Sequence, residues 1–192
     1  MVMKYIIGAY ASAPSLWTED RGAESEFYRV LKESIPNTIG LEIPFFGDSI
    51  HQFGDDYLID ILDDKWVNVI TAVPASFYAL SNNKHFGLAS DQDESRIEAV
   101  RVHKKVNSVI HKINDKKGSK SISSVQICSS PSVPAEGVSS SKEAFMRSIE
   151  EMLSLDWGGA DLLIEHCDCQ KNDQIYQKGF LPIETELEIL DS

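Results

Sequence analysis

Strand-like and helix-like segments alternate along the whole chain, and this alternation constrains the fold more than any other feature. The apolar, β-branched runs typical of buried strands occupy residues 4–11, 38–45, 66–73, 124–128 and 161–166. The intervening segments with helical apolar spacing are 24–34, 55–62, 93–114, 142–155 and 183–190. Strands that alternate with helices indicate βαβ units, so the sequence predicts an α/β fold with a parallel sheet.

Two observations favour a barrel over an open nucleotide-binding sheet. The first strand runs into Ala-Ser-Ala-Pro-Ser at residues 11–15, and neither a G-x-G-x-x-G turn nor a P-loop follows it. Polar side chains also recur near the predicted carboxyl ends of the strands, at Glu42, Thr71, Ser129 and Glu165. That end of a TIM-type barrel is where active sites are built.

The length of the chain predicts a barrel that does not close. A complete barrel has eight β/α units and about 250 residues, whereas this chain has 192 residues and about five units. We therefore expect a single domain, residues 1–192, that forms a partial (β/α) barrel with an unclosed parallel sheet. Because open sheet edges pair with other chains, we also expect marginal stability or a homo-oligomer formed through these edges.

The overall charge and composition exclude several classes of protein. A net charge of −12 repels nucleic acid. The basic cluster on the helix at 93–114, which includes His103 and His111, is expected to be a solvated helix face. No apolar run approaches the roughly 20 residues that span a bilayer. Gly8 and Tyr10 interrupt the first apolar segment, which favours a strand over a signal peptide, and three cysteines without an export signal indicate a cytoplasmic protein.

Several motifs resemble those of a family of uncharacterised bacterial proteins. They are KYIIGAYASAPS at 4–15, GLEIPF at 40–45, ITAVPA at 70–75, DLLIEHCD at 161–168 and KGFLPIETEL at 178–187. That family is similar to the xylose isomerase-like TIM barrels, which include sugar-phosphate isomerases, ketose epimerases and a DNA-repair endonuclease branch. The resemblance covers essentially the whole chain but only about the N-terminal two thirds of the family's length.

The resemblance implies a divalent metal ion, Mn²⁺, Mg²⁺ or Zn²⁺, held by carboxylates and a histidine inside the barrel mouth. Only Glu165 of this sequence corresponds to such a ligand, because the others come from later strands. Oxygen ligands suit Mg²⁺ and Mn²⁺, and the ion polarises a carbonyl while a carboxylate moves a proton. The alternative role for Glu165 is structural, as an acid that caps a turn or pairs with a lysine.

Glu42 is the candidate catalytic residue, because an acid inside an otherwise apolar strand needs a cavity or a partner. It would bind a substrate hydroxyl or act as a base, and an internal salt bridge is the alternative. His51 and Trp17, in loops after the second and first strands, are candidate substrate-binding residues. Trp17 and Phe46 would form an apolar wall for a sugar ring or, alternatively, a lid over the core.

The other histidines are weaker candidates. His166, Cys167, Asp168 and Cys169 are all ligand types, but neighbouring residues on a strand point to opposite faces, so the cluster is interpreted as structural or incidental. His85 lies in the predicted loop after the third strand and is interpreted as incidental.

Three functions follow from this interpretation. The first is a metal-assisted sugar or sugar-phosphate isomerase or epimerase. The second is a catalytically inactive barrel fragment that acts through self-association or a partner. The third, an endonuclease, is disfavoured by the acidic charge and by the lack of a basic groove pattern.

Overall fold

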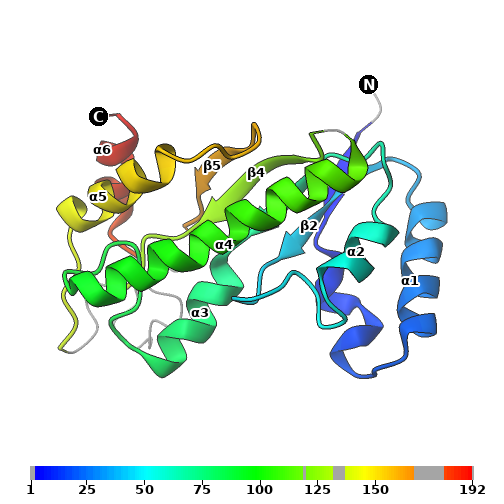
Figure 1. Cartoon of the computed structure of the whole chain (residues 1–192), viewed down its shortest axis with the longest axis horizontal. Helices are drawn as coiled ribbons and strands as arrows, with labels where there is room; N and C mark the ends of the chain where they lie inside the picture. Colours follow the sequence, from blue (N-terminus) through cyan, green and yellow to red (C-terminus); the bar gives the residue numbers. More distant parts are fainter. Residues whose placement is uncertain (1–2, 119, 132–136, 167–179, 192) are drawn as a thin grey trace.

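The computed structural model describes residues 3–118, 120–131, 137–166 and 180–191 (Figure 1). It has an α/β fold with five parallel strands in one sheet of order β1-β2-β3-β4-β5. The strands are β1 (Tyr5–Ile7), β2 (Thr38–Pro44), β3 (Asn68–Thr71), β4 (Ile122–Ile127) and β5 (Asp161–Ile164). The helices are α1 (Arg21–Ser34), α2 (Asp55–Ile61), α3 (Val73–Asn82), α4 (Asp93–Lys117), α5 (Lys142–Leu153) and α6 (Ile183–Leu190).

The sheet is not closed within the described residues, since β1 and β5 are its two edges. Strand order follows chain order, and successive strands are joined through helices, as in a partial (β/α) barrel. The predicted fold class is therefore confirmed. None of the described helices is both long and apolar enough to cross a membrane.

Two segments differ from the sequence prediction. The chain after β1 does not continue as a strand but turns into two short 3-10 helices, Ala9–Ser12 and Pro14–Leu16. Residues after β3 were expected to form a loop, yet they form α3, with Pro74 in its first turn. Proline fits this position because the first helical N–H groups have no partner within the helix. The helix has little apolar periodicity, since Phe77 and Tyr78 are exposed, which explains why the pattern does not reveal it.

The core lies between one face of the sheet and the helices. Alternate strand residues are fully or almost fully buried, namely Leu41, Ile43, Ile70, Val125 and Ile127. The long helix α4, which runs across the strands in Figure 1, packs on this core with Val106, Ile110 and Ile113. This periodicity of two in the strands and of three to four in the helix is what fixes the face of each element that is buried.

The other face of the sheet carries several polar side chains near the carboxyl ends of the strands, among them Glu42, Thr71 and Gln126. Strand register pairs Pro44 with Thr71, Thr71 with Gln126, and Gln126 with Leu163. These residues alternate with the core residues, so they lie on the face turned away from the helices. Leu163 is 47% exposed and Gln126 is partly exposed. The polar row lies toward the carboxyl ends of the strands, where sites of α/β barrels are found.

The basic residues of α4 were predicted to form a solvated helix face, but the structure shows a different environment for some of them. Lys112 and Lys116 form ion pairs with Asp56 of α2 at 3.2 and 2.9 Å. His103 is completely buried, and its Nδ1 bonds to the carbonyl of Ala99 at 2.8 Å. The prediction for His103 is therefore wrong, because this histidine falls on the apolar face of α4 between Val102 and Val106, and both of these valines are buried.

Candidate functional site

A cavity of about 220 Å³ opens at the carboxyl ends of the strands. We call it the acidic cavity, because its described lining includes two carboxylates and no lysine, arginine or histidine. The lining residues come from four strands or the segments that follow them, and α3 contributes three of them. They are Tyr10, Glu42, Thr71, Val73, Pro74, Phe77 and Glu165.

The acidic cavity brings together the two glutamates that the sequence singles out. Glu42 is in β2, on the polar face of the sheet, and is only partly buried. Glu165 directly follows β5, and its backbone N–H donates to the carbonyl of Ile127 at 2.7 Å, which continues the parallel pairing with β4. Two acids that are 123 positions apart in the printed sequence thus face one space.

Tyr10 lines the acidic cavity together with these two acids, and the sequence analysis did not predict it as a site residue. The phenol of Tyr10 donates a hydrogen bond of 3.0 Å to Oε1 of Glu42. Burial of the phenol, the bond to Glu42 and the negative charges of Glu42 and Glu165 raise the pKa of Tyr10 from 10.0 to about 12. The hydroxyl therefore stays protonated and remains a donor at neutral pH. Gly8 was the available signal in the sequence, because a glycine inside an apolar run often marks the point where a strand bends or ends, and β1 ends at Ile7.

Glu24, in the first turn of α1, was not among the predicted site residues, although its carboxylate organises the loops beside the cavity. It is completely buried and accepts hydrogen bonds from the backbone N–H of Ser15 at 2.7 Å and from the Ser15 hydroxyl at 3.0 Å. The N-terminal end of a helix also favours a negative charge. These donors offset the cost of burying the acid.

His51 binds to the same carboxylate. Its Nε2 lies 2.9 Å from Oε1 of Glu24, and its Nδ1 accepts the backbone N–H of Phe53 at 3.1 Å. Since Nδ1 is an acceptor, Nε2 carries the hydrogen and donates it to Glu24. Both ring nitrogens of His51 are thus engaged with the protein, which ties the loop after β2 to α1.

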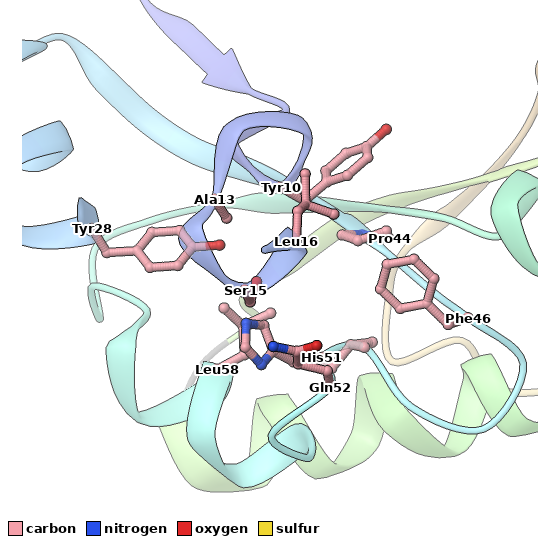
Figure 2. Close-up of a pocket in the computed structure, with 11 residues that line it drawn as sticks. Tyr10, Ala13, Ser15, Leu16, Tyr28, Pro44, Phe46, His51, Gln52 and Leu58 are labelled. Carbon is pink, nitrogen blue, oxygen red and sulfur yellow. The ribbon is translucent and has the colours of Figure 1, made fainter. Parts of the chain in front are cut away.

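A smaller cavity of about 70 Å³, the apolar cavity, lies beside His51 (Figure 2). Tyr10 and Pro44 line it, together with Phe46 and Leu58. In Figure 2 the hydroxyl of Tyr10 points away from His51, so the ring of Tyr10 contributes to the apolar cavity while its hydroxyl bonds to Glu42. Tyr10 therefore separates the two cavities.

Trp17 and Phe46 have different surroundings. Trp17 is 74% exposed and lines neither of the two cavities described above. Phe46 is about half exposed and forms part of the wall of the apolar cavity. His85 is partly buried, and its Nδ1 has no hydrogen-bond partner among the described residues.

His166 lies next to Glu165 but bonds in another direction. Its Nδ1 is 2.8 Å from Oε2 of Glu186, a buried residue of α6. The other oxygen of Glu186 accepts a hydrogen bond of 2.5 Å from Ser129. Ser129, predicted at the site end of the sheet, is therefore buried in a contact with α6. Cys167, Asp168 and Cys169 lie outside the described residues.

The described residues do not assemble a metal site. Nowhere among residues 3–118, 120–131, 137–166 and 180–191 do three histidine, cysteine, aspartate or glutamate side chains gather in a way that would hold an ion. Glu42 and Glu165 supply carboxylate oxygens to one cavity, but Mg²⁺ and Mn²⁺ require more ligands than these.

Two comparisons with known proteins give matches to this chain. The model of a family described as a domain of unknown function, DUF4862, matches residues 6–192. The uncharacterized protein STM3670 of Salmonella typhimurium is 35% identical over 186 residues, which are 97% of this chain and 58% of that protein. The chain thus spans less than two thirds of the length of this relative. No solved structure gives a significant match. The predicted resemblance to a family of uncharacterised bacterial proteins is confirmed, and the chain belongs to the DUF4862 family.

Proposed function

We propose that this chain carries part of an active site that isomerises or epimerises a sugar or sugar phosphate, as in the xylose isomerase-like barrels. One observation carries the proposal: Glu42 and Glu165, from opposite halves of the sheet, line the same cavity at the carboxyl ends of the strands. The donor Tyr10 is bonded to one of them. Carboxylates and a hydroxyl are the groups that bind the hydroxyls of a sugar and move its protons.

The reaction requires a proton to leave and return. Glu42 would accept the proton from the carbon next to the sugar carbonyl, and the electron pair of that C–H bond would form the double bond of an enediolate. The carbonyl oxygen then carries the negative charge. Because Glu42 is now protonated, the single hydrogen of the Tyr10 hydroxyl would turn from Glu42 to this oxygen and stabilise it. Return of the proton to the former carbonyl carbon gives the isomer, while the hydroxyl proton on the neighbouring oxygen passes to the former carbonyl oxygen. The epimer forms instead when Glu42 loses its proton to water and a proton from water reaches the opposite face of the first carbon.

A divalent ion remains part of the proposal only through Glu165. Such an ion would polarise the sugar carbonyl, but its other ligands would have to come from outside the described residues. The removal of the carbon-bound proton is therefore assigned to Glu42, and Tyr10 supplies a hydrogen bond to the carbonyl oxygen. If the proposal holds, the protein acts in sugar metabolism in the cytoplasm and has no membrane or nucleic-acid partner.

Exchange with deuterated water tests this proposal. The chain is incubated in D₂O with aldoses, ketoses and their phosphates, with and without Mn²⁺ or Mg²⁺, and proton NMR follows the hydrogens at C1, C2 and C3. We expect deuterium to enter one sugar, and Glu42→Gln to slow this by about 100-fold or more. The control is Glu188→Gln, an exposed acid of α6 paired with Lys142. No exchange in any sugar, by either this chain or the Salmonella relative, contradicts the proposal.

Self-association through the open edges is the second candidate function. Both edge strands carry exposed apolar side chains, Ile6 in β1 and Leu163 in β5. A chain that acts only by pairing these edges would sediment as a dimer or larger species, and Leu163→Lys would shift it toward the monomer. A wild-type monomer at micromolar concentration in analytical ultracentrifugation contradicts this candidate.

A further inference from the structure

Tyr28 of α1 carries a hydroxyl without a hydrogen-bond partner in the interior of the protein. The residue is only 3% exposed, and its hydroxyl makes no hydrogen bond with any residue that the structure describes. Burial and the negative charge of Glu24, one helical turn earlier, raise the pKa of Tyr28, so the hydroxyl keeps its proton and remains a donor. Buried polar groups in native proteins are nearly always paired, so this free donor indicates a place for a ligand.

The free hydroxyl faces the apolar cavity and is accessible from it. Tyr28 belongs to the lining, and in Figure 2 its oxygen points from α1 toward Ser15 and Leu16. The described side-chain oxygens that are unpaired and also closed off from solvent do not include that of Tyr28, so this oxygen keeps contact with the open space. Leu16 and Phe46 of the same lining are each about half exposed, so a ligand can enter beside them.

The other polar side chains of the described lining are already bonded to the protein. These bonds join Ser15 and His51 to Glu24, Tyr10 to Glu42, and Gln52 to the carbonyl of Thr18. The remaining lining residues are apolar, namely Ala13, Leu16, Pro44, Phe46, Ile50 and Leu58. A ligand in the apolar cavity therefore meets apolar walls and one free donor, the hydroxyl of Tyr28.

This combination restricts the chemistry of the ligand. A buried water typically makes about three hydrogen bonds, whereas the lining side chains leave one free donor, so water fits poorly. A carbonyl oxygen needs only a donor, and a methyl group beside it packs on the apolar walls. The cavity volume of about 70 Å³ is less than half of the roughly 150 Å³ that holds a benzene ring, which suits a group of the size of an acetyl group.

We infer that the apolar cavity binds an acetyl-sized carbonyl group, whose oxygen accepts the hydrogen of the Tyr28 hydroxyl and whose methyl group packs on the apolar walls. The group belongs to a small ketone or to an acetylated molecule whose remainder lies outside, past Leu16 and Phe46. This inference adds a second binding site to the chain and does not depend on the proposed isomerase or epimerase function.

NMR of the tyrosine rings tests the binding. The protein is labelled with ¹³C at the tyrosine carbons that bear the hydroxyls and is titrated with acetone and with N-acetylglucosamine. Glucose is the counterpart of the second probe without an acetyl group. We expect the Tyr28 signal to shift to saturation with at least one of the two carbonyl probes and not with glucose. The Tyr10 signal should shift with the same Kd, because its ring is a wall of the same cavity.

Tyr28→Phe removes the donor and keeps the ring. Its Kd, followed by the Tyr10 signal, should rise about 3- to 10-fold, which corresponds to the loss of one hydrogen bond. The melting temperature without ligand should stay the same or rise, since an unpaired polar group is removed. Tyr78→Phe is the matched control, because Tyr78 is exposed in α3 and lies outside the lining. This variant should bind like the wild type.

Two results would overturn the inference. If the Tyr28 signal shows no saturable shift with either carbonyl probe, the cavity holds solvent only. If Tyr28→Phe binds the probe with the Kd of the wild type, the hydroxyl does not contact the ligand. Either result leaves the proposed isomerase or epimerase function standing, because deuterium exchange at the acidic cavity tests that function separately.

Discussion

Oε1 of Glu24 accepts a hydrogen bond of 2.9 Å from Nε2 of His51, although the Glu24 side chain is completely buried. Glu186 makes similar contacts. It is buried near the start of α6, and its two carboxylate oxygens bond to His166 and Ser129. In both cases a glutamate in the first turns of a helix holds a histidine and a serine from loops after the strands. Two buried carboxylates thus fix the loops around the site end of the sheet.

Removal of the Glu24 carboxylate is expected to destabilise the protein strongly. Glu24→Ala leaves the Ser15 N–H, the Ser15 hydroxyl and the His51 ring without an acceptor in the interior. The expected loss is about 3 to 5 kcal/mol in the free energy of unfolding, measured by urea denaturation. Glu33→Ala on the exposed side of α1, where Glu33 pairs with Arg29, should cost less than about 1 kcal/mol. Equal losses for the two variants would show that the Glu24 contacts contribute little.

Gly40 in β2 is expected to tolerate no side chain. A Cβ at this position would lie 2.0 Å from the carbonyl oxygen of Val67, a backbone atom that precedes β3 and cannot move aside alone. Gly40→Ala should therefore lower the free energy of unfolding by about 3 kcal/mol. Gly118→Ala meets no atom within 4 Å but has a φ of 62°, so it should cost only about 1 kcal/mol. A smaller loss for Gly40→Ala than for Gly118→Ala contradicts this prediction.

The sequence predicts the fold better than the site. Apolar runs identify all five strands, because each has a face in the core. The pattern misses α3, where half-exposed aromatic residues such as Phe77 obscure the period. It also places His103 in solvent, because a histidine among lysines resembles a charged face. The burial of His103 depends on which side of α4 meets the core, and the local composition does not determine that.

Part of the candidate site follows from the strand ends alone. Glu42 and Glu165 come from the ends of predicted strands, and parallel strands bring such ends together. Tyr10 was not predicted, because the chain leaves β1 after Ile7 and turns back in a 3-10 helix. Ser129 was predicted at the site end of the fourth strand, but it is buried in a contact with Glu186 of α6. The sequence does not show the exact register of a short strand or the later helix that covers its end.

The burial of His103 should make the free energy of unfolding depend on pH. Burial lowers the pKa of His103 below the ordinary 6.5. The unfolded chain therefore takes up a proton below about pH 6.5 that the folded chain does not, and the free energy of unfolding falls as the pH decreases, by up to about 1.4 kcal/mol per pH unit. His103→Leu should flatten this slope between pH 7 and 5 in urea titrations. His111→Leu, on the same helix but more exposed, should keep the slope of the wild type. An identical slope in His103→Leu contradicts the prediction.

Tyr10 offers a direct test of the acidic cavity that does not depend on any substrate. Glu42→Gln removes a negative charge and the carboxylate that accepts the phenol, so the pKa of Tyr10 should fall below 12 while staying above 10.0, because burial is its largest cause. Glu165→Gln should lower this pKa less, since that residue contributes only its charge. The raised pKa adds stability that is present below pH 10 and lost as the pH rises through about 12.

The pKa of Tyr10 is measurable by NMR of protein labelled with ¹³C at the tyrosine ring carbon that bears the hydroxyl, with Tyr10→Phe to assign the signal. Tyr28 is the internal control: burial and Glu24 raise its pKa, and Glu42 is not among the causes. Glu42→Gln should therefore leave Tyr28 unchanged. A Tyr10 pKa that stays the same in Glu42→Gln would mean that the two side chains do not meet, and the proposed proton transfer would lose its geometric basis.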